Sequence, residues 1–303
     1  MKKILISMLA VAALVSCSKE ESIRVDQGEA IAFGNAFVDN ATRADYSDGV
    51  QKLTKFNVYG TVTGTAGTVN IFDGVEVTGN VGNAVWSYAQ EFAQYWIVDA
   101  DYNFAAVVDA NVATKDSYNM PLTLTTLADA TSNLEDMLYA TASVQDAAAN
   151  QAPVNFTFSH LLSKAKFTVT SNAEGGYYHT VTGIKVSNFE TGTYTIADGT
   201  WAGATAEDVA FAEIAEVTSA SGAKSNAEML LVPNAATFNV TFTVDLYKDG
   251  TMLGTETKTI PVEKDLVKGN AYNFTIECSV GNPIQFTVTN DPTWTDGGDI
   301  TVQ

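Results

Sequence analysis

Few side chains in this sequence have the chemistry that catalysis or metal binding requires. The 303-residue chain has two cysteines, Cys17 and Cys278, and two histidines, His160 and His179. This set is too small for the usual multi-ligand zinc site. His160 continues a strand-like alternation, which favours a structural role, and His179 has no obvious partner in the sequence. No phosphate-binding glycine loop, nucleophile elbow or zinc-protease motif occurs. We therefore expect no enzyme, no catalytic residue, no cofactor and no metal.

Cys17 is the residue with the clearest chemical role. Lys2 and Lys3 precede an apolar run over residues 4–15, and Leu14-Val15-Ser16-Cys17 follows at once. This is the pattern of a secretory signal that ends in a lipobox, in which the cysteine thiol is acylated. Two or more acyl chains, palmitate among them, would hold the protein stably at a membrane. If Cys17 is acylated, Cys278 has no partner for an internal disulfide.

The arginines point to proteolytic processing. The chain has sixteen Lys plus Arg, but only Arg24 and Arg43 are arginines, and both lie in the first 43 residues. Arg43 stands in the polar stretch 39–45, which has the composition of an exposed, cleavable loop. We expect an Arg-specific protease to cut after Arg43 and leave Ala44 as the new N-terminus.

The composition indicates an all-β protein without nucleic-acid partners. The net charge is −19, whereas phosphate binding needs clustered cations. Hydrophobic residues make up 46% and charged residues 17%, which excludes wholesale disorder. From residue 56 onward, short apolar and polar alternations recur between turn signals, as in β-sandwiches. Asp249-Gly250 predicts a hairpin turn. A polar break at 171–176 divides the body into residues 44–173 and 174–303.

Two segments far apart in sequence have the same hydrophobic spacing. Ile31, Phe33 and Phe37 share one face of an expected strand just before Arg43. Near the C-terminus, Ile284, Phe286 and Val288 repeat the Ile-x-Phe spacing. Either segment could therefore fill one hydrophobic groove.

At this point the sequence resembles a known family, the fimbrillins or type V pilins of the Bacteroidetes, over nearly its full length. The features that carry the resemblance are short motifs in a fixed order: the lipobox at Cys17, the processing sequence 41–44, Asp136-Met137-Leu138-Tyr139-Ala140, Phe156 to Lys164, Leu230-Leu231-Val232-Pro233, Lys268 to Phe274, and the ending from Ile284 to Trp294.

The resemblance implies how the chain is divided, exported, processed and assembled. Residues 1–17 would be the signal peptide and lipobox, and 18–43 a propeptide with the exchangeable strand. Residues 44–173 and 174–303 would be two transthyretin-like β-sandwich domains, the second with the donor strand. The precursor would reach the outer membrane as a lipoprotein, be cut after Arg43, and join other pilin subunits head to tail in an extracellular fimbrium that serves adhesion. Stalk and tip roles both stay open.

Two other interpretations rest on residues outside this scheme. Trp86, Tyr88, Tyr95 and Trp96 could stack on sugars, which would make the protein a glycan-binding surface lipoprotein that never polymerises. Asp99 with Asp101, or Asp296 with Asp299, could bind calcium or act as a carboxylate pair. Solvated acids in an acidic protein are the favoured explanation of these aspartates.

Overall fold

The computed structural model describes residues 29–38, 53–79, 86–108, 121–124, 137–195, 200–234 and 237–291. Within these ranges the protein is almost entirely β-strand, and the one helical element is a 3-10 turn, Gln90–Phe92. The expected all-β class is confirmed. Cys17, Arg43 and Ala44 lie outside the described residues. Among the described residues, no helix has the length and apolar character needed to cross a membrane.

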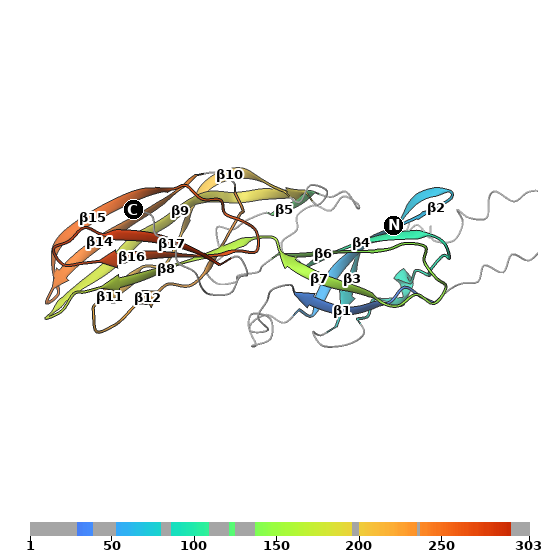
Figure 1. Cartoon of the computed structure of the whole chain (residues 1–303), viewed down its shortest axis with the longest axis horizontal. Helices are drawn as coiled ribbons and strands as arrows, with labels where there is room; N and C mark the ends of the chain where they lie inside the picture. Colours follow the sequence, from blue (N-terminus) through green and yellow to red (C-terminus); the bar gives the residue numbers. More distant parts are fainter. Residues whose placement is uncertain are drawn as a thin grey trace, which may run out of the picture.

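One sheet of six strands is formed by the N-terminal half of the chain (Figure 1). Its strand order is β1-β7-β6-β4-β2-β3. All pairings are antiparallel except that of β1 with β7, which is parallel. The strands are β1 (Phe33–Val38), β2 (Lys55–Gly64), β3 (Gly67–Thr78), β4 (Asp101–Val108), β6 (Leu138–Val144) and β7 (Val154–His160).

Two further sheets are formed mainly by the C-terminal half. The first has the order β10-β9-β14-β15, with β5 and β11 also paired to β9, and the second has the order β12-β8-β16-β17, with β13 also paired to β8. The strands of the first are β5 (Pro121–Leu124), β9 (Tyr177–Thr195), β10 (Thr200–Ala210), β11 (Ile214–Val217), β14 (Phe238–Lys248) and β15 (Thr251–Val262). The strands of the second are β8 (Ser163–Ser171), β12 (Lys224–Ser225), β13 (Met229–Leu231), β16 (Ala271–Cys278) and β17 (Gln285–Asp291).

Alternating side chains bury the inner faces of these two sheets against each other. On β14, Val240 and Phe242 are buried, whereas Thr241 and Thr243 between them pair with threonines of β15 on the outer face. The Phe242 ring lies 5.9 Å from that of Phe286 on β17, so one core joins the two sheets as a β-sandwich. This alternation is what the sequence pattern predicts for strands with one buried face.

The turn between β14 and β15 also agrees with the sequence. Asp249 and Gly250 have φ of 48° and 82°, the positive values that a primed two-residue turn requires. The hairpin predicted from Asp-Gly is therefore confirmed.

The chain changes from the first sheet to the sandwich at Leu161 and Leu162, because β7 ends at His160 and β8 already pairs with β16. The expected boundary at 173–174 instead falls in the connection between β8 and β9. A separate hydrophobic cluster lies where the two parts meet. We call it the junction cluster; it consists of Tyr59, Ala105, Val107, Met137, Leu161, Leu162, Tyr194, Leu230 and Val232.

Candidate functional site: an N-terminal strand among aromatic rings

The N-terminal strand β1 is held by backbone hydrogen bonds on both sides. On one side it pairs in parallel with β7. On the other side three bonds join β1 and the residues just before it to residues 86–96: Trp86 N–H to Phe33 O at 3.0 Å, Ile31 N–H to Gln94 O at 2.8 Å, and Trp96 N–H to Glu29 O at 3.3 Å. The segment therefore occupies a slot between a regular strand and an irregular stretch of chain.

Phe33 is the centre of this slot. Its side chain is fully buried. Four rings surround it at centroid distances of 5.5 to 6.1 Å, and with Phe33 they form what we call the aromatic cluster: Phe72, Tyr88, Phe104 and Phe156. Offset and edge-on contacts of this kind add to the free energy of burial itself. The N-terminal segment thus contributes the middle of the core of the first sheet.

Neighbouring residues fit β1 closely into its position. Ile31 is 1% exposed, and the hydroxyl of Tyr88 donates a hydrogen bond of 2.6 Å to its carbonyl. Burial raises the pKa of the Tyr88 phenol, which keeps that proton available for the bond. A Cβ added to Gly34 would overlap Oδ1 of Asn155 on β7, so only glycine fits there without a shift of that side chain.

Of the three residues expected on one buried face, Ile31, just before β1, and Phe33, its first residue, are buried. A register shift between Phe33 and Ala36 interrupts the simple alternation and brings Ala36 to the buried side. The side chain of Phe37 is outside the described part of the chain.

The proposed sugar platform is wrong as a set. Trp86 and Trp96 are each only 2% exposed. The ring centroids of Trp86 and Phe56 are 5.0 Å apart, and those of Trp96 and Tyr102 are 4.7 Å apart. Both tryptophans are core residues of the first sheet, and only Tyr95, at 40% exposure, is largely open to solvent. This irregular stretch has no apolar–polar alternation from which the burial could be predicted.

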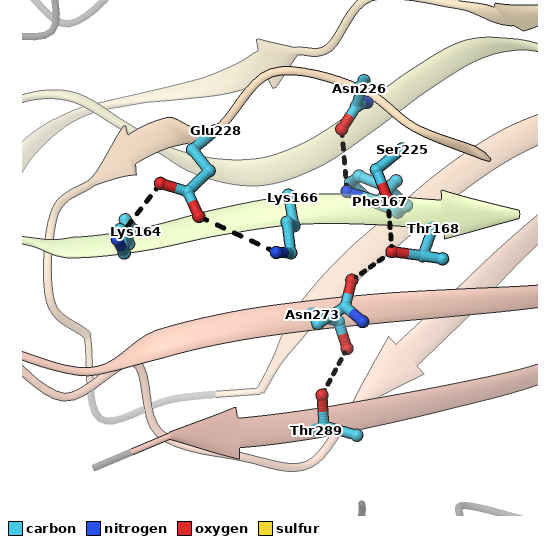
Figure 2. Close-up of polar contacts among 9 residues, drawn as sticks. All are labelled: Lys164, Lys166, Phe167, Thr168, Ser225, Asn226, Glu228, Asn273 and Thr289. Atoms are coloured by element: carbon cyan, nitrogen blue, oxygen red, sulfur yellow. Dashed lines mark hydrogen bonds and ion pairs between the residues drawn. The ribbon is translucent and has the colours of Figure 1, made fainter. Parts of the chain in front are cut away.

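The second Ile-x-Phe segment is the edge strand β17. Within residues 29–291 as described, its one strand partner is β16, where Thr289 Oγ1 donates to the carbonyl of Asn273 at 3.2 Å (Figure 2). Phe286 and Val288 are 8% and 1% exposed and belong to the chain's own sandwich core, with Ile284 packed partly against it. In this state these three side chains fill their own sandwich.

A polar network covers the other face of the β8–β16–β17 sheet (Figure 2). Thr168 donates to the Asn273 side-chain oxygen at 2.7 Å. Farther along β8, Lys164 lies 3.1 Å and Lys166 4.0 Å from the carboxylate of Glu228. These contacts join β8 to β16 and to Glu228 just before β13, whereas β17 pairs with one strand in the described part of the chain.

The titratable residues noted in the sequence do not form a reactive site. His179, expected to lack a partner, has Ser171 Oγ 2.8 Å from its Nδ1, and burial lowers its pKa. His160 is buried. Burial raises the pKa of the Cys278 thiol to about 12. Among the residues that the structure describes, no three His, Cys, Asp or Glu side chains gather as a metal site would need.

The predicted aspartate pairs give no cation site in the described part. Asp101 Oδ1 accepts a hydrogen bond of 3.0 Å from the backbone N–H of Asp146. Asp99 adopts a positive φ of 60° just before β4. Asp101 thus has a structural role at the start of that strand. Asp296 and Asp299 lie outside the described residues.

Comparison with known proteins identifies solved structures that have a similar fold. No curated protein sequence matches the chain. A crystal structure of a candidate cell adhesion protein from Bacteroides uniformis aligns with a TM-score of 0.56 at 18% identity, over 88% of this chain and 98% of the other. A second, from Bacteroides ovatus, has a TM-score of 0.56 at 16% identity, over 87% and 96%. At these identities the likeness shows a shared fold.

The sequence comparison shows the family. A profile described as fimbrillin-like matches residues 42–292, which is most of the chain and begins one residue before Arg43. The family consists of structural proteins of the fimbrial and adhesion type, and the resemblance seen in the sequence is thereby confirmed. The chain with the buried N-terminal strand and the β-sandwich described above is a member of the fimbrillin-like family.

Proposed function

We propose that this protein is a pilus subunit that polymerises by strand exchange after cleavage at Arg43. In this scheme Cys17 is acylated, the precursor reaches the outer membrane as a lipoprotein, and an Arg-specific protease cuts between Arg43 and Ala44. The segment 18–43, which includes β1, then leaves with its lipid. The cut subunit enters an extracellular fimbrium and serves adhesion.

The observation that carries this proposal is the burial of Phe33. A residue that lies ten positions before the proposed cut forms the middle of the aromatic cluster of the first sheet. Loss of β1 would therefore open a slot lined with aromatic rings and unpaired backbone groups of β7. Such a slot is a strong acceptor for another extended strand.

The covalent tether explains why the precursor would stay monomeric. While the bond after Arg43 is intact, β1 competes for its own slot at an effective concentration on the order of millimolar. Burial of Ile31 and Phe33 contributes roughly 1.5 to 3 kcal/mol each. After the cut this advantage disappears, because a departed strand is diluted into the surrounding medium.

The donor is assigned to the C-terminal region that starts with Ile284. Its Ile284 and Phe286 repeat the spacing of Ile31 and Phe33. In the part of the chain that the structure describes, β17 pairs with β16 alone, so its release would break one ladder. The burial lost in its own sandwich would be regained in the slot of the next subunit. A contact of this kind joins different surfaces on the two partners, so it propagates as an open fibre.

The division into two domains is part of the same proposal. The two bodies would be the sheet of β1–β4, β6 and β7, and the sandwich of β5 and β8–β17. We place the division at 161–162, where the chain changes sheets, in preference to 173–174. Each body would then resemble a transthyretin-like domain, one providing the slot and the other the donor strand.

The test follows the precursor, residues 18–303, through treatment with an Arg-specific protease. We expect a product that begins at Ala44 and forms SDS-resistant multimers. The matched control is Arg43→Lys, which keeps the charge but removes the site, and it should stay monomeric. A synthetic peptide of residues 29–38 added in excess should suppress the multimers, because it reoccupies the slot without altering the protein.

Two results would contradict parts of this proposal. Clean cutting without multimers would indicate the tip adhesin of such a pilus, which needs a slot but no donor, or a surface lipoprotein that never polymerises. Multimers that form equally well from the Arg43→Lys variant, or in the presence of the peptide, would show that the β1 slot is not the acceptor.

A further inference from the structure

Asp245 is an unusual residue for its position. It lies in the middle of β14, a strand with neighbours on both sides, and it is only 8% exposed. Its side chain is on the outer face, because Val244 beside it is buried in the sandwich core. Within the described part of the chain its carboxylate has no hydrogen bond and no ion pair. Aspartate is depleted in strands, and a carboxylate that is partly removed from water without a partner lowers stability.

Two tyrosines stand next to this carboxylate. Tyr247 follows two residues later on the same face of β14, and Tyr178 on β9 is its cross-strand partner. Their rings are stacked with centroids 4.9 Å apart and an interplanar angle of 2°. Both side chains are partly exposed. A pair of parallel rings therefore rises from the outer face directly beside Asp245.

Hydroxyl groups complete the surface around Asp245. Its direct cross-strand neighbours are Thr180 on β9 and Thr255 on β15. Farther along the same face, Thr243 pairs with Thr257 through their hydroxyls at 2.8 Å. The face thus combines aromatic rings, one carboxylate and a row of hydroxyls.

This combination matches the chemistry of a sugar. The C–H face of a pyranose ring packs on an aromatic ring, and its hydroxyls donate to a carboxylate in short, charge-assisted hydrogen bonds. A cation would need several oxygen ligands around it, and a single carboxylate is present here. Because Asp245 is acidic and the chain has a net charge of −19, sialylated or sulfated glycans would be repelled.

We propose that Tyr178, Asp245 and Tyr247 form a binding surface for uncharged carbohydrate on the outer face of β9 and β14. The function of Asp245 explains its poor fit to the fold: a sugar hydroxyl supplies the partner that the protein does not. This surface lies in the sandwich, on different strands from β1 and β17, and does not depend on polymerisation.

The test uses the purified, uncut protein on a glycan array that carries neutral, sialylated and sulfated glycans, followed by calorimetry with the strongest neutral glycan. We expect binding to neutral glycans. Asp245→Asn should weaken it at least fivefold and also raise the melting temperature, because it removes a partly desolvated charge without a partner in the protein. Tyr247→Thr and Tyr178→Thr should weaken it similarly while retaining β-propensity. Tyr95→Thr, at an exposed tyrosine of the first sheet, is the matched control and should bind normally.

The paired readout separates a binding role from a structural one. Lower stability of Asp245→Asn with unchanged glycan binding would show that the carboxylate stabilises the fold, and the proposal would be wrong. No binding to any neutral glycan, or preference for the anionic ones, would overturn it as well. Failure of the Arg43 cleavage test would leave this result unaffected, since the protein used here is uncut.

Discussion

The position of Phe33 depends on close packing among single side chains that come from distant parts of the sequence. Its neighbours Phe72, Tyr88, Phe104 and Phe156 come from three strands and a loop. The period-two pattern of 31 and 33 was enough to predict which face of β1 is buried. It could not predict these partners, because they follow from tertiary packing and have no local signal.

Truncation of Phe33 tests how much the N-terminal strand stabilises the precursor. Phe33→Ala should lower the free energy of unfolding of the uncut protein by roughly 3 to 5 kcal/mol, as for other buried phenylalanines. Phe92→Ala is the control, because Phe92 is 45% exposed, and it should change little. Urea titration of both variants measures this. Equal stability of the two variants would mean that β1 contributes little to the core.

The thiol of Cys278 should be inert in the folded protein. It is 2% exposed, and burial raises its pKa to about 12, so the thiolate is scarce at pH 8. We expect no reaction with a thiol reagent at pH 8 until denaturant is added, and one thiol per lipid-free chain that begins at Ser18 thereafter. Since the thiol ionises more easily when unfolded, it contributes stability below pH 9 that is lost as the pH rises toward 12. Fast labelling of the native protein would contradict this burial.

At the scale of strands, the two segments assigned to exchange are both sheet edges. Among the strands that the structure describes, β1 pairs with β7 alone and β17 with β16 alone. The alternating patterns predicted these two strands, and Asp249-Gly250 predicted the turn between β14 and β15. The pairing of β1 with β7 was not predictable, because long-range packing decides which strands pair in parallel. The continuous strand β9 was not predictable either, because its interior contains Gly183 and Gly192.

The hairpin turn offers a test of element geometry. Gly250 has a φ of 82°, which a residue with a Cβ adopts at a cost, so Gly250→Ala should destabilise the protein by roughly 1 kcal/mol. Gly254→Ala is the matched control on β15, where an added Cβ would meet no atom within 4 Å and φ is ordinary. Thermal melts compare the two variants. A neutral Gly250→Ala would show that the turn relaxes freely.

At the scale of the whole molecule, the junction cluster connects the first sheet to the sandwich. The ring centroids of Tyr139 on β6 and Tyr194 on β9 are 6.2 Å apart, and Trp201 Nε1 donates a hydrogen bond of 2.6 Å to the carbonyl of Leu161. Because both parts bury side chains there, each stabilises the other. The sequence motifs near Leu162 and Leu230 marked residues of this cluster without revealing that they meet.

Cooperative unfolding is the expected consequence of the junction. Native protein should show a single calorimetric transition, because opening either part would expose the junction cluster. Tyr194→Ala removes a ring that is 2% exposed and should resolve two transitions. Tyr95→Ala, at 40% exposure, should retain one. Two transitions in the native protein would mean that the parts unfold independently.

The length of strand β9 also bears on how the protein resists tension. Its nineteen residues pair with β5 from the N-terminal half at one end and with β14 along the other. At about 3.3 Å per residue the strand extends roughly 60 Å. Tension applied along it would load its ladder hydrogen bonds in shear, so many would have to break together. If the subunit forms a filament as proposed, β9 would resist tension along the sandwich.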